Sequence, residues 1–325
     1  MKKTIALLVV LFLLSAGLMI FVFAPQINPI EQQIENSQTK EEKAMPAPEK
    51  PKPDPIKEQL NSMTLDEKVA QLLIVQNLGM TISEETTKQL ASAPYGGYIL
   101  MEDNYGTLSD TRKFVQDLQE KSKTKLIIAT DQEGGLVQRL AMIKDKPATN
   151  IPAMSRVGKA NDEDLAKNVG RIMAEEMRVI GINVDFAPDA DVFSNPNNTV
   201  IGTRSFSAQP EVVSKMSLAL AKGLEDNGVI ATYKHFPGHG DTSVDSHLSL
   251  PIIDRTRDQL DKCELVPFKN AIANGAKIIM TGHIALPKIT NNNLPTTFSK
   301  KIQIQLLREE LGYDGLIVTD NSKLL

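Results

Sequence analysis

The chain has 325 residues, a formal net charge of −4 at pH 7 and 41% hydrophobic residues. This apolar fraction is enough for a full core and excludes a wholly disordered chain, and the weakly acidic balance offers no electrostatic footprint for DNA or RNA. The single cysteine, Cys263, excludes a disulfide scaffold and a multi-thiolate metal site. The length allows two domains or one large α/β barrel of about 250 residues.

The first 24 residues predict a membrane anchor or signal segment. Lys2 and Lys3 precede an uncharged apolar run over residues 4–24, which is long enough to cross a hydrocarbon core of about 30 Å. The flanking charges favour an internal N-terminus, with the remainder of the chain outside the cell membrane. A cleaved signal peptide, which would make the protein secreted, is the competing interpretation, although Pro25 makes the end of the run a poor cleavage site.

Residues 25–55 predict a linker. Proline, glutamine, glutamate, lysine and asparagine dominate this segment, and prolines recur between Pro46 and Pro55. A segment of this composition is extended and semi-rigid, and it buries little apolar surface. We therefore expect a stalk that leads to a domain over residues 56–325.

The domain over residues 56–325 is predicted to alternate strands and helices. Thr64 and Glu67 match a capping box that begins a helix. After it, short apolar runs of the continuous kind found in buried parallel strands are separated by amphipathic segments of helical length. The expected strands are 72–75, 97–100, 126–130, 184–187, 229–233, 278–281 and 316–319, and the expected helices include 165–180 and 212–227.

The alternation predicts an α/β fold with a parallel sheet. No glycine-rich dinucleotide motif and no Walker motif follows the first expected strand. This favours a TIM-type (β/α)8 barrel over a nucleotide-binding fold.

Polar residues follow or end most of the expected strands. They are Asp131, Asp189, Lys234 with His235, His283 and Asp320. In a (β/α)8 barrel the carboxyl ends of the strands converge on one mouth, where catalytic residues lie. The pattern therefore predicts one polar cleft, although a structural role such as a helix cap is the simpler interpretation for any one of these residues alone.

The densest chemistry lies between residues 234 and 247, which contain three of the four histidines. Proline and glycine make this stretch a loop, in which Asp245 and His247 can approach each other. A carboxylate beside an imidazole raises the imidazole pKa, and such a pair can donate a proton and take one back. Two alternatives remain: a hydrogen-bonded loop without chemistry, and a metal site made by His235, His239, Asp241 and His247, whose spacing matches no common zinc pattern.

The stretch from Lys234 to Thr242, followed by Asp245-Ser246-His247, resembles the β-N-acetylhexosaminidase branch of glycoside hydrolase family 3. The resemblance runs from about residue 60 to residue 320. Further blocks are similar in order and spacing: DQEGG at 131–135, GINVDFAP at 181–188, SNP at 194–196, IGTRSF at 201–206 and GLIVTD at 315–320.

The resemblance implies roles for individual residues. Asp320 matches the nucleophile that attacks the anomeric carbon, and His247 matches the acid/base, with Asp245 as its partner. Retaining hydrolysis needs a nucleophile and a group that first protonates the leaving oxygen and then deprotonates water, and here a His–Asp pair takes the place of the usual second carboxyl. The positions implied to bind the sugar are Asp131, Arg139, Arg204, Lys234 and His235. A structural ion pair is the alternative role for the two arginines.

These roles imply an exported, retaining β-N-acetylglucosaminidase that removes terminal N-acetylglucosamine from peptidoglycan-derived fragments. The expected partners are an N-acetylglucosamine-containing glycan or muropeptide and, through the N-terminal segment, the membrane. We expect no nucleic acid, no cofactor and no metal.

The chain departs from the family pattern at two places. Leu136 stands where the family usually has arginine, and the match stops beyond Asp320, where the family continues with a helix, an eighth strand and a final helix. We therefore expect a barrel truncated after its seventh strand, with the C-terminal βα unit missing and two sheet edges open. This expectation keeps a second interpretation available, in which the chain is an inactive barrel remnant or a sugar-binding module.

Overall fold

The computed structural model describes residues 54–242 and 250–321. The predicted anchor, nearly all of the predicted linker, and the loop residues Asp245 and His247 lie outside the described residues. By its internal contacts the chain divides into two units, Met1–Gln59 and Leu60–Leu325, and the fold described below is that of the second. Among the described helices, none combines the length and the apolar character needed to cross a bilayer.

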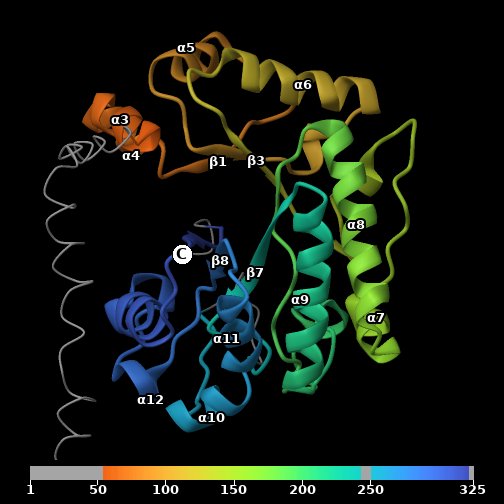
Figure 1. Ribbon diagram of the computed structural model, residues 1–325, viewed down its shortest axis with the longest axis vertical. Helices are drawn as coiled ribbons and strands as arrows, with labels where there is room; N and C mark the ends of the chain where they lie inside the picture. Colours follow the sequence, from red (N-terminus) through yellow and green to blue (C-terminus); the bar gives the residue numbers. More distant parts are fainter. Residues whose placement is uncertain (1–53, 243–249, 322–325) are drawn as a thin grey trace, which may run out of the picture. The chain divides into compact units, whose positions relative to one another are not determined.

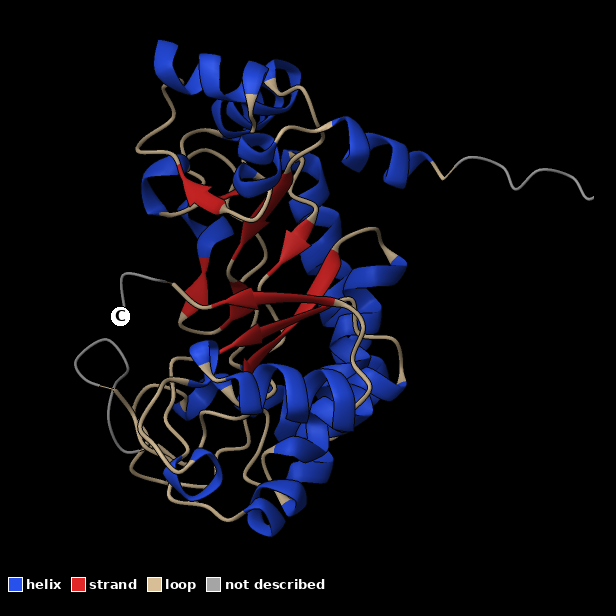
Figure 2. Ribbon diagram, turned by 90° about the vertical axis from the view of Figure 1, so that its left-hand side faces the viewer, coloured by secondary structure: helices blue, strands red, loops and turns tan. Residues whose placement is uncertain are grey.

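Seven parallel strands form one sheet, and their order across the sheet is their order along the chain. They are β1 (Ile74–Gln76), β2 (Gly97–Ile99), β3 (Ile127–Thr130), β6 (Val184–Asp185), β7 (Ile230–Phe236), β8 (Ile278–Thr281) and β9 (Leu316–Thr319). Each strand overlaps the apolar run that predicted it. The sheet curls as strands of a barrel do (Figure 2), and β1 and β9 are its two edges within the described part of the chain. The predicted TIM-type fold class is confirmed, with seven strands described.

Most helices of the second unit follow a strand and lie along the outer face of the sheet (Figure 1). The α-helices are α3 (Pro55–Ser62), α4 (Leu65–Ala70), α5 (Glu84–Ser92), α6 (Leu108–Lys121), α7 (Met154–Ala160), α8 (Glu163–Ile180), α9 (Pro210–Asp226), α10 (Arg257–Lys262), α11 (Leu265–Ala273) and α12 (Pro287–Thr290). Short 3-10 turns are η1 (Glu102–Asn104), η2 (Arg139–Met142), η3 (Gly202–Arg204) and η4 (Thr296–Phe298), and η5 (Lys301–Glu310) is a π-type helix.

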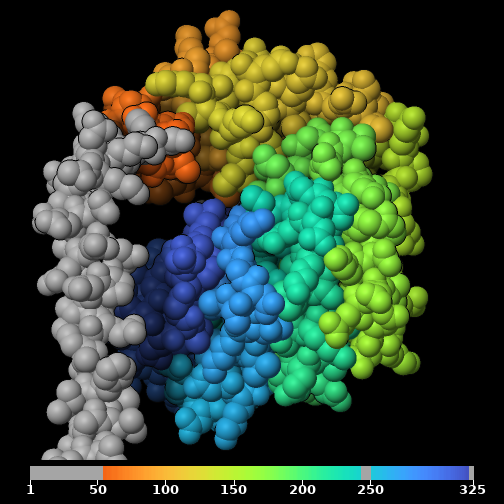
Figure 3. Space-filling view, in the orientation of Figure 1, coloured from red at the N-terminus to blue at the C-terminus, as the bar shows by residue number. Residues whose placement is uncertain are grey.

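The predicted start of α4 is confirmed. The Thr64 side chain accepts the backbone N–H of Glu67 at 3.2 Å, and the Glu67 carboxylate accepts that of Thr64 at 2.6 Å. The two long predicted helices are α8 and α9, which pack along each other. Gly170 permits this close approach, because a Cβ there would lie 2.2 Å from the Leu220 carbonyl oxygen. In Figure 3, α8, α9 and α11 form neighbouring parts of one outer surface.

Two apolar clusters hold the sheet. Inside the curl lie Ala129, Val184, Phe186, Ile278 and Met280, all buried. A much larger cluster fills the space between the outer face of the sheet and the helices. Both faces of the strands are therefore buried, which explains why the strand sequences are continuous apolar runs.

A two-stranded antiparallel hairpin follows β3 directly. It consists of β4 (Gln132–Gly134) and β5 (Val137–Gln138). Residues 132–134 carry two polar side chains and a glycine, so no apolar pattern predicted a strand there. The hairpin positions Glu133, which becomes the centre of the site.

Candidate active site

The polar residues that end the strands lie together at the carboxyl edge of the sheet. Asp131 follows β3, and its carboxylate accepts a hydrogen bond from the ammonium of Lys234 on β7 at 2.8 Å. Asp189, beyond β6, forms a backbone bridge with the same lysine. Beyond β9, the Asp320 backbone N–H donates to the carbonyl of Thr281 at 3.0 Å. The predicted convergence is confirmed, while the chemical roles of these residues stay predictions.

Lys234 is buried between two carboxylates. Its Nζ lies 2.8 Å from Asp131 Oδ1 and 2.6 Å from Glu133 Oε1. Burial by itself would lower the pKa of Lys234, but the charges of Asp131 and Glu133 outweigh burial and raise it. The ammonium is therefore charged at neutral pH, and two of its three N–H donors are engaged.

Arg204 forms a bidentate ion pair with the same glutamate. Its Nε and Nη2 donate to Glu133 at 2.7 and 2.9 Å, and Nη1 donates to the carbonyl of Val200 at 3.2 Å. Burial tends to raise the pKa of Glu133, but the two cations, Lys234 and Arg204, hold it below its ordinary value. The DQEGG block contains Glu133, and this block is the signal in the sequence that could have identified it.

Asp189 is a poorly compensated carboxylate of the site. Its Oδ1 accepts the backbone N–H of Asp191 at 3.0 Å, whereas its buried Oδ2 has no hydrogen-bond partner among the described residues. The nearest cation to Oδ2 is the Nη2 of Arg204, at 3.6 Å. Burial and then the charge of Asp191 raise the pKa of Asp189 to about 7, against the opposing charge of Arg204.

Asp191 connects the strand histidine to the histidine loop. Its Oδ2 bonds Nδ1 of His235 at 2.7 Å, and its Oδ1 accepts the backbone N–H of His239 at 2.6 Å. Burial opposes protonation of His235, but the Asp191 carboxylate more than offsets it and raises the pKa of His235. For His239, burial and the charge of His235 lower the pKa. Sequence reasoning did not single out Asp191, although it lies two residues beyond the predicted Asp189.

The surroundings of Asp320 favour the ionised form of its carboxyl group. Burial would raise the pKa of its carboxyl, but the positive charge of His235, the backbone N–H of Asn321 and the charge of Lys234 hold the pKa below its ordinary value. His283 lies nearby, with its Nε2 at 3.2 Å from the carbonyl oxygen of Asn321. The carboxylate of Asp320 is thus available as a nucleophile at neutral pH.

Arg139 occupies a different environment from Arg204. It begins η2, at the end of the hairpin, and its Nη1 pairs with the exposed Glu102 at 2.9 Å. Within the described part of the chain, its guanidinium makes no hydrogen bond or ion pair with Lys234, Glu133 or Asp131. Leu136, in the turn of the same hairpin, is 85% exposed.

The alternative metal set expected from the sequence includes His247, which lies outside the described residues. Among its described members, the carboxylate of Asp241 accepts two hydrogen bonds of 2.9 Å from Arg255. The described group that does have metal-ligand spacing is Asp189, Asp191 and His235. In this group Asp191 is paired with His235, and the Oδ2 of Asp189 lies 3.6 Å from the Nη2 of Arg204.

Comparison with known proteins identifies the family of the chain. A model of the glycosyl hydrolase family 3 N-terminal domain matches residues 64–324. The chain belongs to glycoside hydrolase family 3. The family match covers β1 to β9 and every site residue predicted from the sequence, including Asp245 and His247, which lie outside the described residues.

Relatives within family 3 carry hexosaminidase names. Beta-hexosaminidase A of Pseudoalteromonas piscicida is 40% identical over 259 residues, which are 74% of this chain and 43% of that protein. A family 3 β-N-acetylglucosaminidase from Paenibacillus sp. str. FPU-7 has a similar structure, with a TM-score of 0.77 and 39% identity, over 81% of this chain and 50% of that one. The present chain thus spans half or less of these two relatives.

A second similar structure contains a sugar analogue. NagZ from Neisseria gonorrhoeae in complex with N-trifluoroacetyl-D-glucosamine matches with a TM-score of 0.71 and 34% identity, over 77% of this chain and 74% of that one.

Proposed function

We propose that this chain is an exported, retaining β-N-acetylglucosaminidase that removes terminal N-acetylglucosamine from peptidoglycan-derived fragments. The observation that carries the proposal is the ionised Asp320 at the carboxyl edge of the sheet, beside His235 and Lys234. The hexosaminidase names of the relatives and the glucosamine analogue bound to the Neisseria protein support the choice of sugar.

The reaction requires two displacements at the anomeric carbon. In the first, a carboxylate oxygen of Asp320 forms a bond to that carbon while the bond to the glycosidic oxygen breaks, and the imidazolium of His247 gives its proton to the leaving oxygen. In the second, water attacks the same carbon, His247 takes the proton of the water, and the bond to Asp320 breaks. Asp245 stabilises the imidazolium that is present before the first displacement and forms again in the second.

The described site supplies binding groups around that carbon. Asp131 uses Oδ1 for Lys234, so its Oδ2 can accept from a sugar hydroxyl, and the remaining N–H of Lys234 can donate to a sugar oxygen. The bidentate ion pair with Glu133 keeps Arg204 in one orientation, which lowers the entropy lost when it binds substrate. His235 is fixed by Asp191 in the same way.

The first test replaces the nucleophile. Asp320→Asn keeps the shape of the side chain but removes its charge, so hydrolysis of a chromogenic N-acetylglucosaminide should fall on the order of 10³-fold or more. Binding of N-acetylglucosamine, measured by calorimetry, should persist. An unaltered rate would exclude Asp320 as the nucleophile. Wild-type binding without any hydrolysis would favour the alternative of a sugar-binding module.

The second test addresses the acid/base. His247→Ala should slow hydrolysis least for substrates with good leaving groups, because these need little protonation, and azide should partly restore the second displacement. Asp245→Asn should shift the pH profile. The metal interpretation predicts instead that a chelator abolishes activity and that His239 matters as much as His247.

Export is proposed from the sequence of residues 4–24. Cell fractionation tests it: the full-length protein should sediment with membranes and be digested by protease added outside the cell. A mature protein in the medium that begins near Pro25 would replace the anchor by a signal peptide, and a protease-protected protein would exclude export.

A further inference from the structure

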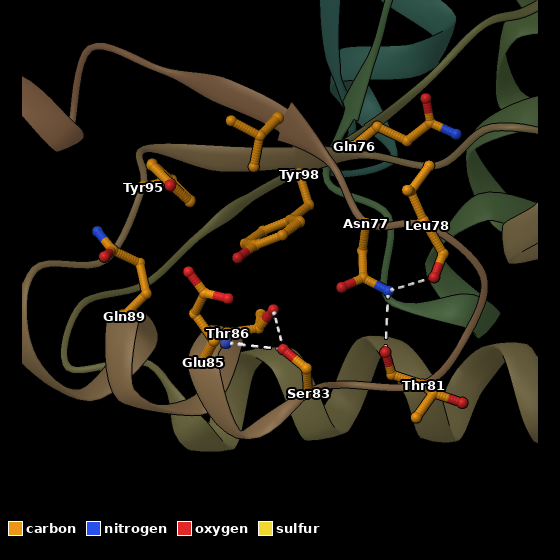
Figure 4. Close-up of a pocket in the computed structure, with 11 residues that line it drawn as sticks. Gln76, Asn77, Leu78, Thr81, Ser83, Glu85, Thr86, Gln89, Tyr95 and Tyr98 are labelled. Carbon is orange, nitrogen blue, oxygen red and sulfur yellow. Dashed lines mark hydrogen bonds between the residues drawn. The ribbon is translucent and has the colours of Figure 1, made fainter.

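A cavity of about 410 Å³ opens on the outer face of the sheet, beside α5 (Figure 4). Its wall includes Val75 on β1 and Tyr98 on β2, which pack with the outer cluster, whereas Ile74 and Ile99 beside them pack inside the curl. The volume falls within the range of roughly 300–1,000 Å³ found for small-molecule sites. None of its lining residues belongs to the site described above.

The phenol of Tyr98 is an unsatisfied donor in this pocket. Tyr98 is 2% exposed, and its hydroxyl has no hydrogen-bond partner among the described residues. A buried tyrosine hydroxyl normally finds a partner. Burial raises the pKa of Tyr98 to about 12, so the hydroxyl keeps its proton at neutral pH. Figure 4 shows this hydroxyl pointing to the side of the cavity where Glu85 lies.

The other groups around the cavity are a carboxylate, amides, hydroxyls, aliphatic side chains and a second aromatic ring. Glu85 and Gln89, on α5, face Tyr98 across the cavity (Figure 4). The amide nitrogen of Gln89 donates to the carbonyl of Ala93 at 2.5 Å, which leaves its amide oxygen to accept from a ligand. The Tyr95 ring lies edge-on to Tyr98, with centroids 6.2 Å apart. The described lining residues include no lysine, arginine or histidine.

We propose that this pocket is a second carbohydrate site that binds one neutral pyranose ring. A pyranose has an apolar C–H face that can pack on Tyr95, and its hydroxyls can donate to Glu85 and Gln89 while accepting from Tyr98. Phosphates and carboxylates are disfavoured, because Glu85 is uncompensated by any cation in the wall. The choice of an N-acetylglucosamine glycan as ligand rests on the proposed function. The inference that the pocket binds a neutral pyranose rests on its lining residues.

The test measures binding of an N-acetylglucosamine trimer by calorimetry to the full chain carrying Asp320→Asn, which prevents turnover. Tyr98→Phe removes only the hydroxyl, and Glu85→Gln removes only the charge. Each substitution should raise the dissociation constant of one class of binding sites about three- to tenfold. Glu84→Gln is the matched control, because Glu84 is the adjacent acidic residue of α5 and does not line the pocket, and it should change nothing.

The same substitutions in the wild-type background should leave hydrolysis of a small chromogenic substrate unchanged, which separates this pocket from the barrel site. Trimer binding at a single class of sites that Tyr98→Phe and Glu85→Gln leave intact would overturn the proposal. Pocket variants that weaken the binding of a cationic amine but not the binding of any neutral sugar would overturn it as well. A chain without hydrolytic activity would refute the proposed function alone, because the pocket's binding is measured independently of turnover.

Discussion

The two arginines predicted to bind the same sugar lie in contrasting environments. Arg204 makes two hydrogen bonds to the buried Glu133, which also forms an ion pair with Lys234. Arg139 pairs once with Glu102, whose side chain is 63% exposed. The two arginine side chains are similarly buried, at 20% and 15% exposed, so the difference lies in the carboxylates, because Glu133 is only 1% exposed.

This difference changes what each ion pair can do. An exposed pair is screened by water and stabilises the fold by about 0–1 kcal/mol. A buried charge has lost its hydration, so removing its partner leaves it uncompensated and costs several kcal/mol. Glu133 therefore holds Lys234 and Arg204 in place, whereas the hydrated Glu102 leaves Arg139 able to exchange its partner.

The largest effect on this comparison is expected for Glu133→Ala. The substitution leaves Lys234 and Arg204 buried and facing each other, so the free energy of unfolding should fall by about 3–5 kcal/mol. Urea unfolding followed by circular dichroism measures it. A loss below about 1 kcal/mol would mean that Asp131 and Asp189 compensate both cations and that Glu133 is not the centre of the site.

Asp189→Asn should change the pH dependence of stability. The folded chain keeps the proton on Asp189 up to about pH 7, whereas the unfolded chain releases it near the ordinary value of 3.8. The free energy of unfolding should therefore fall as the pH rises from about 4 to 7, by up to about 1.4 kcal/mol for each pH unit. The amide cannot ionise, so the variant should lose this slope and gain relative stability at pH 8. Parallel curves for both proteins would contradict the raised pKa.

Asp191→Asn sharpens the comparison at Asp320, the predicted nucleophile. Without this carboxylate the pKa of His235 falls, its positive charge is lost near neutral pH, and the pKa of Asp320 rises. The acidic limb of the pH profile of kcat/KM should therefore move upward, by roughly half to one pH unit. A uniform loss of rate with an unmoved limb would indicate that Asp191 acts on the structure alone.

The smallest effect is expected for Glu102→Ala. Because the pair with Arg139 is partly hydrated, the free energy of unfolding should change by less than about 1 kcal/mol. Thermal unfolding measures it beside Glu133→Ala under the same buffer. A loss as large as that of Glu133→Ala would remove the distinction between the two arginines.

Sequence alone predicted much of the fold because its signals are local. Continuous apolar runs give buried parallel strands, and a polar residue directly after such a run must lie at the carboxyl edge of the sheet. This is why Asp131, Lys234 and Asp320 were found without knowledge of the tertiary structure. The roles of His247 and Asp245 rest on the family resemblance and stay predictions.

Tertiary structure decided which of these residues work together and how strongly. Glu133 and Arg204 are 71 residues apart, and Asp131 and Lys234 are 103 apart, so no local pattern reports either contact. The hairpin that carries Glu133 lacks an apolar pattern and depends on its neighbours. The pocket beside α5 arises only where two strands and a helix meet. Local sequence thus determined the strands and their polar ends, whereas burial, and with it the charge state of each group, followed from long-range packing.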